Sequence, residues 1–412
     1  MLSHVPKKSS LPSILSVCFA VFSSAASMSC VFAILPSVGR SLGLNEIQLS
    51  LVVTPAAIIF VLFGPVWGKI GQYWSSKSIL VVALIVVATF TLLFAWTIVW
   101  RQNGYISLTE CFLFLTASRI FLSPFSAAVF PVAQSWIART TDNSIRPQAL
   151  AGLGAAFGLG MVAAPGLVAV ATGFGLLAPF YIVIFFLLAS SYFSKKTLIN
   201  EFSIPITKKS TEINENNDKK HTTYLLLWKP LTMLVLLYMV YGILMQVTGF
   251  KIQDQFNLTP IETAQRTGVT LMITAISLVL TQLFFIKKPF FTLKNNKIII
   301  LTTSSLGLMG LTSMIFNTPF YIQIISMASF GLSLGVFLPY LLSNLTYIAQ
   351  EAGDQTRVAG FSGSAQGLGM ILGPILGASA YHLSPYIPYS IAALILLLTL
   401  IIYMLNNSSN SN

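Results

Sequence analysis

The feature that most constrains this chain is a series of long apolar runs that recurs from one end to the other. A helix needs about 20 apolar residues to cross a hydrocarbon layer about 30 Å thick, because each residue adds about 1.5 Å. Twelve segments meet that length: 11–36, 47–67, 78–100, 108–134, 147–171, 175–194, 229–250, 265–286, 297–316, 319–348, 357–381 and 386–405. We therefore predict an all-α membrane protein with twelve transmembrane helices.

The composition excludes other classes of protein. Only 8% of the 412 residues are charged and 55% are hydrophobic, whereas a soluble domain carries about 25% charged residues and a disordered chain is poor in apolar ones. Cys18, Cys30 and Cys111 lie in apolar runs without the spacing of metal ligands or redox pairs. We expect neither a metal nor a cofactor. The first run continues past Cys30 to Pro36, longer than the apolar part of a cleavable signal, so we expect a retained span.

The basic residues are distributed unevenly between the two ends of the predicted spans. Eighteen of the 23 fall on one side, four on the other (Arg40, Arg101, Lys251 and Arg266), and Arg119 lies inside a span. Cytoplasmic loops are enriched in Lys and Arg, so we predict cytoplasmic N- and C-termini in a plasma membrane, the inner membrane if the source is bacterial. Scattered charges of this kind do not form the single basic surface that nucleic-acid binding requires.

The chain divides into two halves of six spans. The one long polar stretch, about residues 197–224, is typical of a flexible cytoplasmic linker. We predict one six-helix bundle over 1–194, a linker over 195–228 and a second bundle over 229–412.

A repeat supports this division. Residues 151–165 read AGLGAAFGLGMVAAP and residues 360–374 read GFSGSAQGLGMILGP, with seven of fifteen positions identical at an offset of 209. Chance likeness between Gly-rich helices is the alternative. Gly154 and Gly158, like Gly363 and Gly367, are four residues apart and predict close helix contacts. The prolines of the two segments, Pro165 and Pro374, permit bends. We interpret these features as conformational hinges, with packing alone as the alternative.

These motifs resemble those of the major facilitator superfamily, over nearly the whole chain. Gly369, Gly373, Pro374 and Gly377 are similar to the antiporter motif of its drug exporters, and Gly160 and Pro165 match it more loosely in the first half. The resemblance implies two pseudo-symmetric six-helix bundles and places the chain near the twelve-span drug:proton antiporters. Residues 64–72 resemble the family's loop motif at Gly64, Lys69 and Gly71, but Gly68 replaces its acidic residue and Gln72 a basic one.

Arg119 is the main candidate for coupling. A guanidinium at membrane depth costs about 3 kcal/mol, so it should face a wet cavity or a partner. The resemblance implies a role in proton transfer, and a purely structural arginine is the alternative. The acids nearest the transport path are Glu110 and Asp254, whose alternative role is ordinary solvation at a span end.

The family fold places the first, fourth, seventh and tenth spans around a central cavity. The polar and aromatic candidates to line it are Ser27, Gln134, Tyr238, Tyr241, Gln246, Tyr340, Asn344 and Gln366. Each could instead form a hydrogen bond between helices. A cavity with one cation and few acids suits a neutral or anionic amphiphile.

Together these features predict a monomeric secondary transporter whose partners are the lipid bilayer and a small-molecule substrate. The favoured hypothesis is proton-driven efflux of a drug-like compound or a secreted metabolite such as a siderophore, with the proton gradient as energy source. The alternatives are a proton-coupled importer of a nutrient or metal chelate and, more remotely, a non-transporting membrane receptor. The sequence contains no nucleotide-binding loop or nucleophile constellation, so we do not expect an enzyme.

Overall fold

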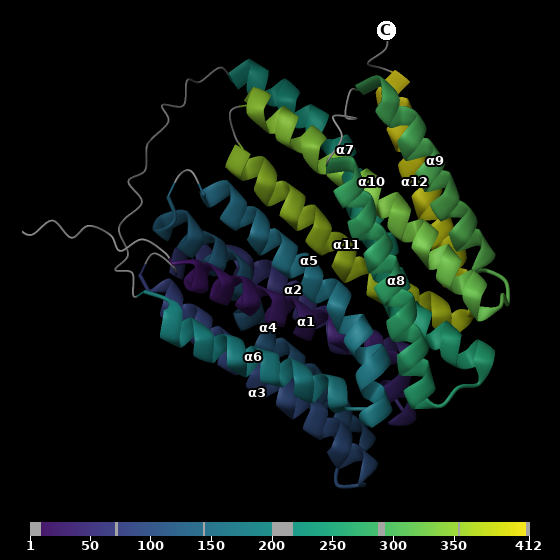
Figure 1. Cartoon of the computed structure of the whole chain (residues 1–412). Coiled ribbons are helices and arrows are strands. Elements are labelled where there is room, and N and C mark those ends of the chain that lie inside the picture. The colour runs from purple at the N-terminus through teal and green to yellow at the C-terminus, as the bar shows by residue number, and fades with distance from the viewer. Residues whose placement is uncertain are drawn as a thin grey trace, which may run out of the picture. The chain divides into compact units, whose positions relative to one another are not determined.

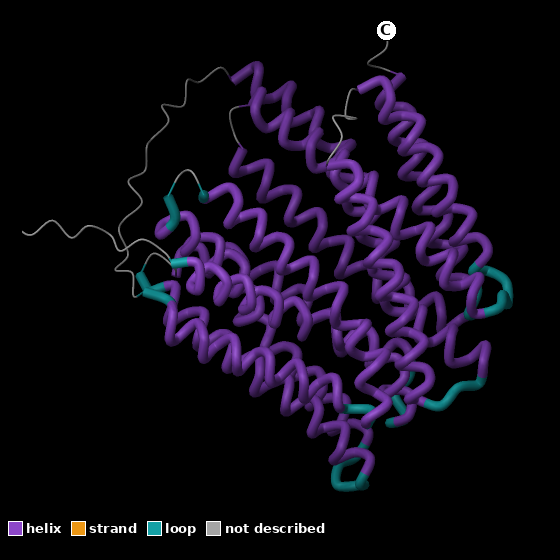
Figure 2. The backbone as a smooth tube through the Cα atoms, viewed as in Figure 1, coloured by secondary structure: helices purple, strands orange, loops and turns teal. Residues whose placement is uncertain are grey.

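The computed structural model describes residues 10–70, 73–142, 145–199, 217–286, 293–352 and 355–408. These residues form twelve α-helices and one short 3-10 turn, η1 (Thr172–Phe174), and contain no strand (Figures 1 and 2). The helices are α1 (Leu11–Ser41), α2 (Glu46–Ile70), α3 (Ser76–Gln102), α4 (Leu108–Thr140), α5 (Arg146–Ala171), α6 (Ala178–Thr197), α7 (Asn217–Phe256), α8 (Pro260–Ile286), α9 (Leu293–Ser313), α10 (Phe320–Ala352), α11 (Gln355–Leu383) and α12 (Ile387–Ser408).

The helices extend beyond the apolar runs that predicted them. The predicted span 229–250, for example, lies within the 40-residue helix α7. Hydrophilic residues can continue a helix past the apolar layer, and capping residues then decide where it begins. At α3, the Ser75 hydroxyl accepts a hydrogen bond from the Ser78 amide at 3.2 Å. Hydropathy therefore located the helices but not their ends.

Ten of the described helices are long and apolar enough to cross a membrane. Of the remaining two, α9 is apolar only over the shorter stretch Lys297–Ser313, and α11 does not qualify. The sequence of α11 is rich in Gly, Ser and Ala, which lowers its hydropathy without preventing a helix. The prediction of twelve helices is confirmed, although two of them carry a weak apolar signal.

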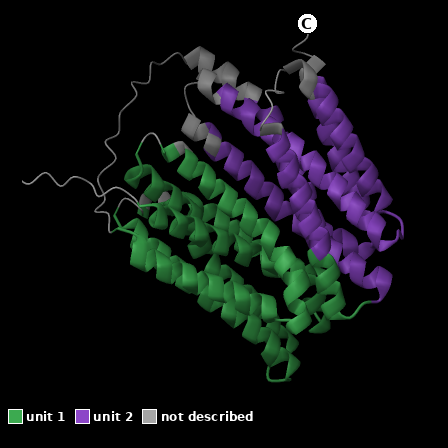
Figure 3. Cartoon of the chain, viewed as in Figure 1, with its two compact units in different colours: residues 1–207, 258–268 green, residues 208–257, 269–412 purple. Residues whose placement is uncertain are grey.

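The chain forms two compact units (Figure 3). Unit 1 comprises residues 1–207 and 258–268, and unit 2 comprises 208–257 and 269–412. Much of the predicted linker, residues 200–216, lies outside the described residues. The domain boundaries at 194 and 229 stay a prediction.

The same helix pairs recur in both halves. In the first half, α1 packs against α5 and α6, while α3 packs against α4 and α6. The pairs shifted by six helices repeat this pattern: α7 packs against α11 and α12, and α9 against α10 and α12. This correspondence is the pseudo-symmetry that the repeat predicted.

The repeated glycines at close helix contacts are Gly160 and Gly369. A methyl group built on Gly369 would lie 2.5 Å from the carbonyl oxygen of Val235 on α7. At Gly160 it would overlap the carbonyl oxygen of Phe22 on α1. Each glycine therefore allows its helix to touch the backbone of the first helix of its own half.

The close contacts predicted at the four-residue spacing are wrong at three of the four glycines. A methyl group built on Gly154, Gly158 or Gly363 would meet nothing within 4 Å. The contact predicted at Gly367 stays a prediction. The face of each helix that makes the close contact is centred instead on Gly160 in α5 and on Gly369 in α11. A sequence of one helix does not show which face its neighbour covers.

Candidate substrate-binding and coupling residues

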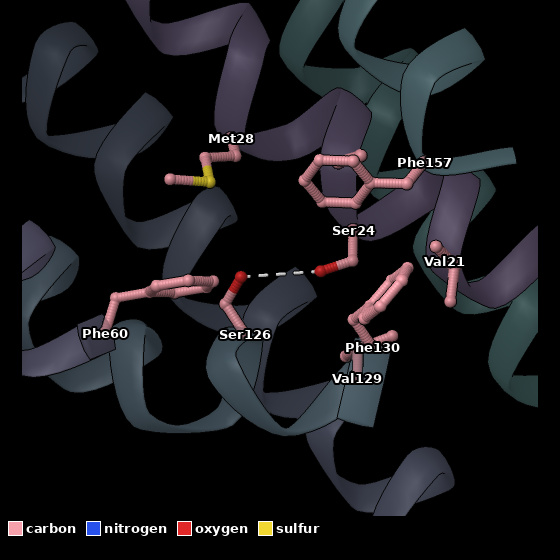
Figure 4. A pocket seen from close by; sticks show the side chains of 9 residues that line it. Val21, Ser24, Met28, Phe60, Ser126, Val129, Phe130 and Phe157 are labelled. Atoms are coloured by element: carbon pink, nitrogen blue, oxygen red, sulfur yellow. Dashed lines mark hydrogen bonds between the residues drawn. The ribbon is translucent and has the colours of Figure 1, made fainter. Parts of the chain in front are cut away.

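A small pocket lies among four helices of unit 1 (Figure 4). Its walls come from α1, α2, α4 and α5, and its lining residues are Val21, Ser24, Ala25, Met28, Phe60, Ser126, Val129, Phe130 and Phe157. Its polar lining consists of two hydroxyl groups, those of Ser24 and Ser126, which are joined by a 3.4 Å hydrogen bond. The rest of the lining is apolar, and Figure 4 shows Phe60 and Phe130 on either side of this serine pair. The volume of the pocket is about 20 Å³, room for about one water molecule.

Arg119 is buried in α4, with 4% of its surface exposed. Its Nε has no hydrogen-bond partner, and no carboxylate among the described residues pairs with it. A buried guanidinium without a partner is costly. The structure therefore keeps Arg119 as the central charged candidate.

Neither Ser27 nor Gln134 lines this pocket. The Ser27 hydroxyl lies 3.2 Å from that of Thr91 on α3, which is the interhelical hydrogen bond that the sequence left as an alternative. Gln134 is exposed on α4. Ser24, three residues before Ser27 on α1, lines the pocket instead, because a shift of three residues along a helix turns a side chain by about 60°.

Four candidates from α7 and α11 are placed within unit 2. Tyr238 and Tyr241 are half-buried on α7, and the Tyr238 Cβ faces the backbone at Gly369. Gln246 is 1% exposed and its Nε2 has no partner. Gln366 is half-buried on α11. Gln246 is the most informative of the four, because a buried amide donor is rarely left unsatisfied.

The two candidates on α10 differ in their surroundings. Tyr340 belongs to an aromatic cluster, with its ring 5.4 Å from that of Tyr403 and 6.4 Å from that of Phe337. Packing accounts for Tyr340 without a ligand. Asn344 is half-buried one turn further along the same helix.

Asp254 and Glu110 have different environments. The Tyr381 hydroxyl, on α11, donates a 2.7 Å hydrogen bond to the Asp254 carboxylate. Tyr381 is buried, and its ring packs against that of Phe250 in a tilted arrangement with the ring centres 5.5 Å apart. Asp254 is thus an exposed acid that a buried side chain holds in a fixed orientation.

Glu110 forms a capping box at the start of α4. Its carboxylate accepts a 2.7 Å bond from the Ser107 amide, and its own amide donates to the Ser107 hydroxyl at 3.3 Å. The residue is exposed. Starting the helix therefore accounts for Glu110 without a role in coupling.

Sequence reasoning placed Lys251 outside the membrane, but the structure buries it. Only 2% of its surface is exposed. Its Nζ donates to the carbonyl oxygens of Met314 and, at 3.0 Å, Phe316, just after α9 ends, and lies 4.8 Å from the centre of the Tyr389 ring. The ammonium therefore caps the negative end of a helix dipole.

Gln255 on α7 and Gln323 on α10 add hydrogen bonds to the contact between Lys251 and the α9–α10 connection. Gln255 donates to the carbonyl of Thr318 at 2.6 Å, and Gln323 donates to the Gln255 side-chain oxygen at 2.6 Å. We call Lys251, Gln255 and Gln323 the α7 clasp. The clasp binds alternate carbonyls of the α9–α10 connection, and no signal in the sequence marks it, because a lysine at a span end usually faces water.

The remaining family motifs are only partly described. Gly64 lies inside α2, so the motif begins in a helix instead of a loop, and a methyl group there would meet nothing within 4 Å. Gly71 and the side chain of Lys69 lie outside the described residues. On α11, Gly373 faces Met239 and Gly377 faces Val247 and Ile243. Pro374 lies against Gly242, and Pro165 occupies the matching place inside α5.

The family of the chain follows from a comparison of its sequence with known protein families. The sequence profile of the Major Facilitator Superfamily matches residues 17–354. The chain belongs to this superfamily. It is therefore a transporter that crosses the membrane several times, and it binds a small-molecule substrate.

Individual members of the superfamily are distant. The chain is 22% identical to Multidrug resistance protein 2 of Bacillus subtilis (strain 168) over 376 residues, which cover 90% of this chain and 89% of that protein.

Three solved structures share the fold. A D-xylose-proton symporter aligns with a TM-score of 0.67 at 14% identity, covering 95% of this chain and 96% of the other. A bacterial homolog of the human lysosomal transporter Spinster, inward-facing and occupied, gives 0.67 at 14% over 96% of each chain. The nucleoside transporter NupG gives 0.66 at 14%, over 95% and 97%. Identity this low indicates the fold alone.

Proposed function

We propose that this protein exports a small organic molecule across the plasma membrane in exchange for protons. The observation that carries the proposal is the likeness to a multidrug resistance protein along 90% of the chain. The exported molecule is a drug-like compound or a secreted metabolite. We propose that the protein works as a monomer, by alternating access, and catalyses no chemical conversion.

The proposed roles follow from burial and contact. The apolar residues around the small pocket of unit 1 contribute to the surface that contacts the substrate. Arg119 is the fixed charge within the membrane, and Asp254 is the acid that exchanges a proton, held by Tyr381. The close contacts at Gly160 and Gly369 allow α5 and α11 to slide on α1 and α7 during the cycle.

Flux in proteoliposomes tests direction and coupling. The purified chain is reconstituted, and a panel of drug-like dyes and organic acids is followed while a proton gradient of either sign is imposed. Efflux coupled to protons predicts that solute moves against the proton flow. Solute movement with the proton flow would make the protein an importer of the symport type. Flux that ignores the gradient would remove proton coupling from the proposal, and absence of flux across the panel would favour a receptor.

Two variants sharpen this test. Asp254→Asn is expected to lose the response to the gradient while it retains downhill exchange of substrate. Tyr381→Phe removes only the hydrogen bond and should produce a weaker form of the same defect. Full gradient response in Asp254→Asn would contradict the role of this acid.

A further inference from the structure

The last turn of α7 is held by different elements on two of its sides. An α-helix turns 100° per residue, so Lys251 and Gln255 differ by about 40° and share a side, while Asp254 points about 100° away from Gln255. The first side contacts the α9–α10 connection through the α7 clasp. The second side contacts Tyr381 of α11, whose hydroxyl donates to the Asp254 carboxylate at 2.7 Å.

Gln323 completes the clasp from α10. Its Nε2 donates to the Gln255 side-chain oxygen at 2.6 Å and to the Thr318 carbonyl oxygen at 3.2 Å. Gln255 donates to the same carbonyl at 2.6 Å. Because Gln323 is fully buried, water does not compete for these bonds. The three groups form a closed triangle that fixes the half-buried Gln255 side chain to α10.

This turn needs to be held because the end of a helix is its least fixed part. The last four carbonyl groups of a helix lack partners within it, and terminal turns fray. Asp254 stands two residues before the end of α7 and is exposed, so packing does not fix its side chain. Tyr381 is buried, so its hydroxyl cannot follow a moving carboxylate. The 2.7 Å bond between them therefore requires that the turn stay in place.

We propose that Gln255 and Gln323 are positioning residues that keep Asp254 against Tyr381. The inference rests on the proposed function, in which Asp254 exchanges the coupling proton. The two amides do not titrate, so they hold the acid in one orientation while it gains and loses its proton. Lys251 anchors the same turn through its bonds to the α9–α10 connection.

Amide hydrogen exchange of the purified full-length protein, followed by mass spectrometry, tests the holding of the turn without substrate or gradient. Gln323→Met removes the amide donor and keeps a similar side-chain length. Residues 251–256 are expected to exchange about tenfold faster, as the loss of one or two shielded bonds predicts. Gln255→Met should give the same acceleration, and it keeps the test if Gln323→Met does not fold. Gln102→Met, at an exposed glutamine that ends α3, is the control and should change nothing in this segment.

The pH profile of gradient-driven flux tests positioning, because a purely structural role would lower the thermal midpoint and leave the profile in place. Gln323→Met should shift the profile in the same direction as Tyr381→Phe. The two changes together should shift it no further than the larger single change, since both act through one hydrogen bond.

A second background separates Asp254 from the other titratable groups around this turn, which include Lys251, Tyr386 and Tyr389. In Asp254→Asn, Gln323→Met should leave the pH profile of downhill exchange unchanged. A shift in that background would place the effect on one of the other groups and overturn the proposal.

The remaining outcomes distinguish this inference from the function beneath it. Unchanged amide exchange in Gln323→Met and Gln255→Met would overturn the proposal whatever the protein transports. Faster exchange with an unchanged pH profile, in a protein that loses its gradient response in Asp254→Asn, would also overturn it and leave the exporter in place. Full gradient response in Asp254→Asn would instead refute the proposed coupling acid, and amide exchange alone would then decide whether the two glutamines hold the turn.

Discussion

Arg119 is the one arginine classed as buried among the described residues of unit 1. We predict that Arg119→Ala abolishes gradient-driven flux in proteoliposomes while the protein still inserts and purifies as a folded species. The substitution removes a buried charge without breaking a pair, so the thermal midpoint should stay level or rise slightly. Normal flux in this variant would contradict the proposed role of Arg119 in transport.

For Glu110, in contrast to Arg119, we expect substitution to leave transport unchanged. Glu110→Gln preserves the side-chain oxygen that meets the Ser107 amide but weakens the charge interaction at the start of α4. We expect stability to fall by less than about 1 kcal/mol and the pH profile of flux to remain that of the unsubstituted protein. A shifted pH profile would restore Glu110 as a coupling residue.

Lys251 is predicted to matter for stability. Lys251→Met leaves the buried carbonyl oxygen of Met314 without this donor, while that of Phe316 keeps its bond from the Thr318 amide. The change should cost about 1 to 3 kcal/mol and lower the thermal midpoint. Lys297→Met, at an exposed lysine of α9, is the matched control and should change little. Identical midpoints for the two variants would show that the α7 clasp contributes no stability.

At the scale of residues, the sequence identified side chains that interrupt an apolar run. Arg119 stood out because a charge inside an apolar run is rare. The partners of Lys251 could not be predicted, since its carbonyl acceptors come 63 and 65 residues later in the chain. Met28, Phe60 and Phe157 were missed because apolar residues in a membrane helix carry no signal that separates a pocket from packing.

At the scale of helices, the glycines of α11 allow a paired test. Gly369→Ala places a methyl group 2.5 Å from the Val235 carbonyl and 2.6 Å from the Tyr238 Cβ, and we expect a loss of about 1 to 3 kcal/mol with slowed exchange. Gly363→Ala has open space and should be neutral or stabilising by about 0.5 to 1 kcal/mol. Both are compared by thermal unfolding and by the rate of substrate exchange.

Equal effects at the two glycines would contradict the contact map of α7 and α11. The existence of these helices followed from hydropathy and from the repeat at an offset of 209 residues. Which glycine makes the contact did not follow, because the face of a helix that is covered depends on its neighbour's position. The hydrogen bond from Ser29 to the Met161 carbonyl shows the equivalent contact between α1 and α5.

At the scale of the whole molecule, orientation stays a prediction from charge. Eighteen basic residues on one side against four on the other predict cytoplasmic termini. A green fluorescent protein fused after Asn412 should fluoresce in a bacterial host, and alkaline phosphatase fused there should be inactive. The same reporters placed in the α3–α4 connection, residues 103–107, should give the opposite result. Phosphatase activity at the C-terminus would invert the topology.

The composition of α11 has a consequence for how the protein is made. This helix is not apolar enough to qualify as a span, yet it shares the most extensive contact of the described helix pairs, with α7. A translocation channel sorts segments by hydropathy as they leave the ribosome, so α11 enters lipid less readily than its neighbours. Its insertion then depends on α7, synthesised about a hundred residues earlier, which supplies a helix face already in place. We therefore expect unit 2 to complete its membrane insertion only after α11 has been synthesised and has packed against α7.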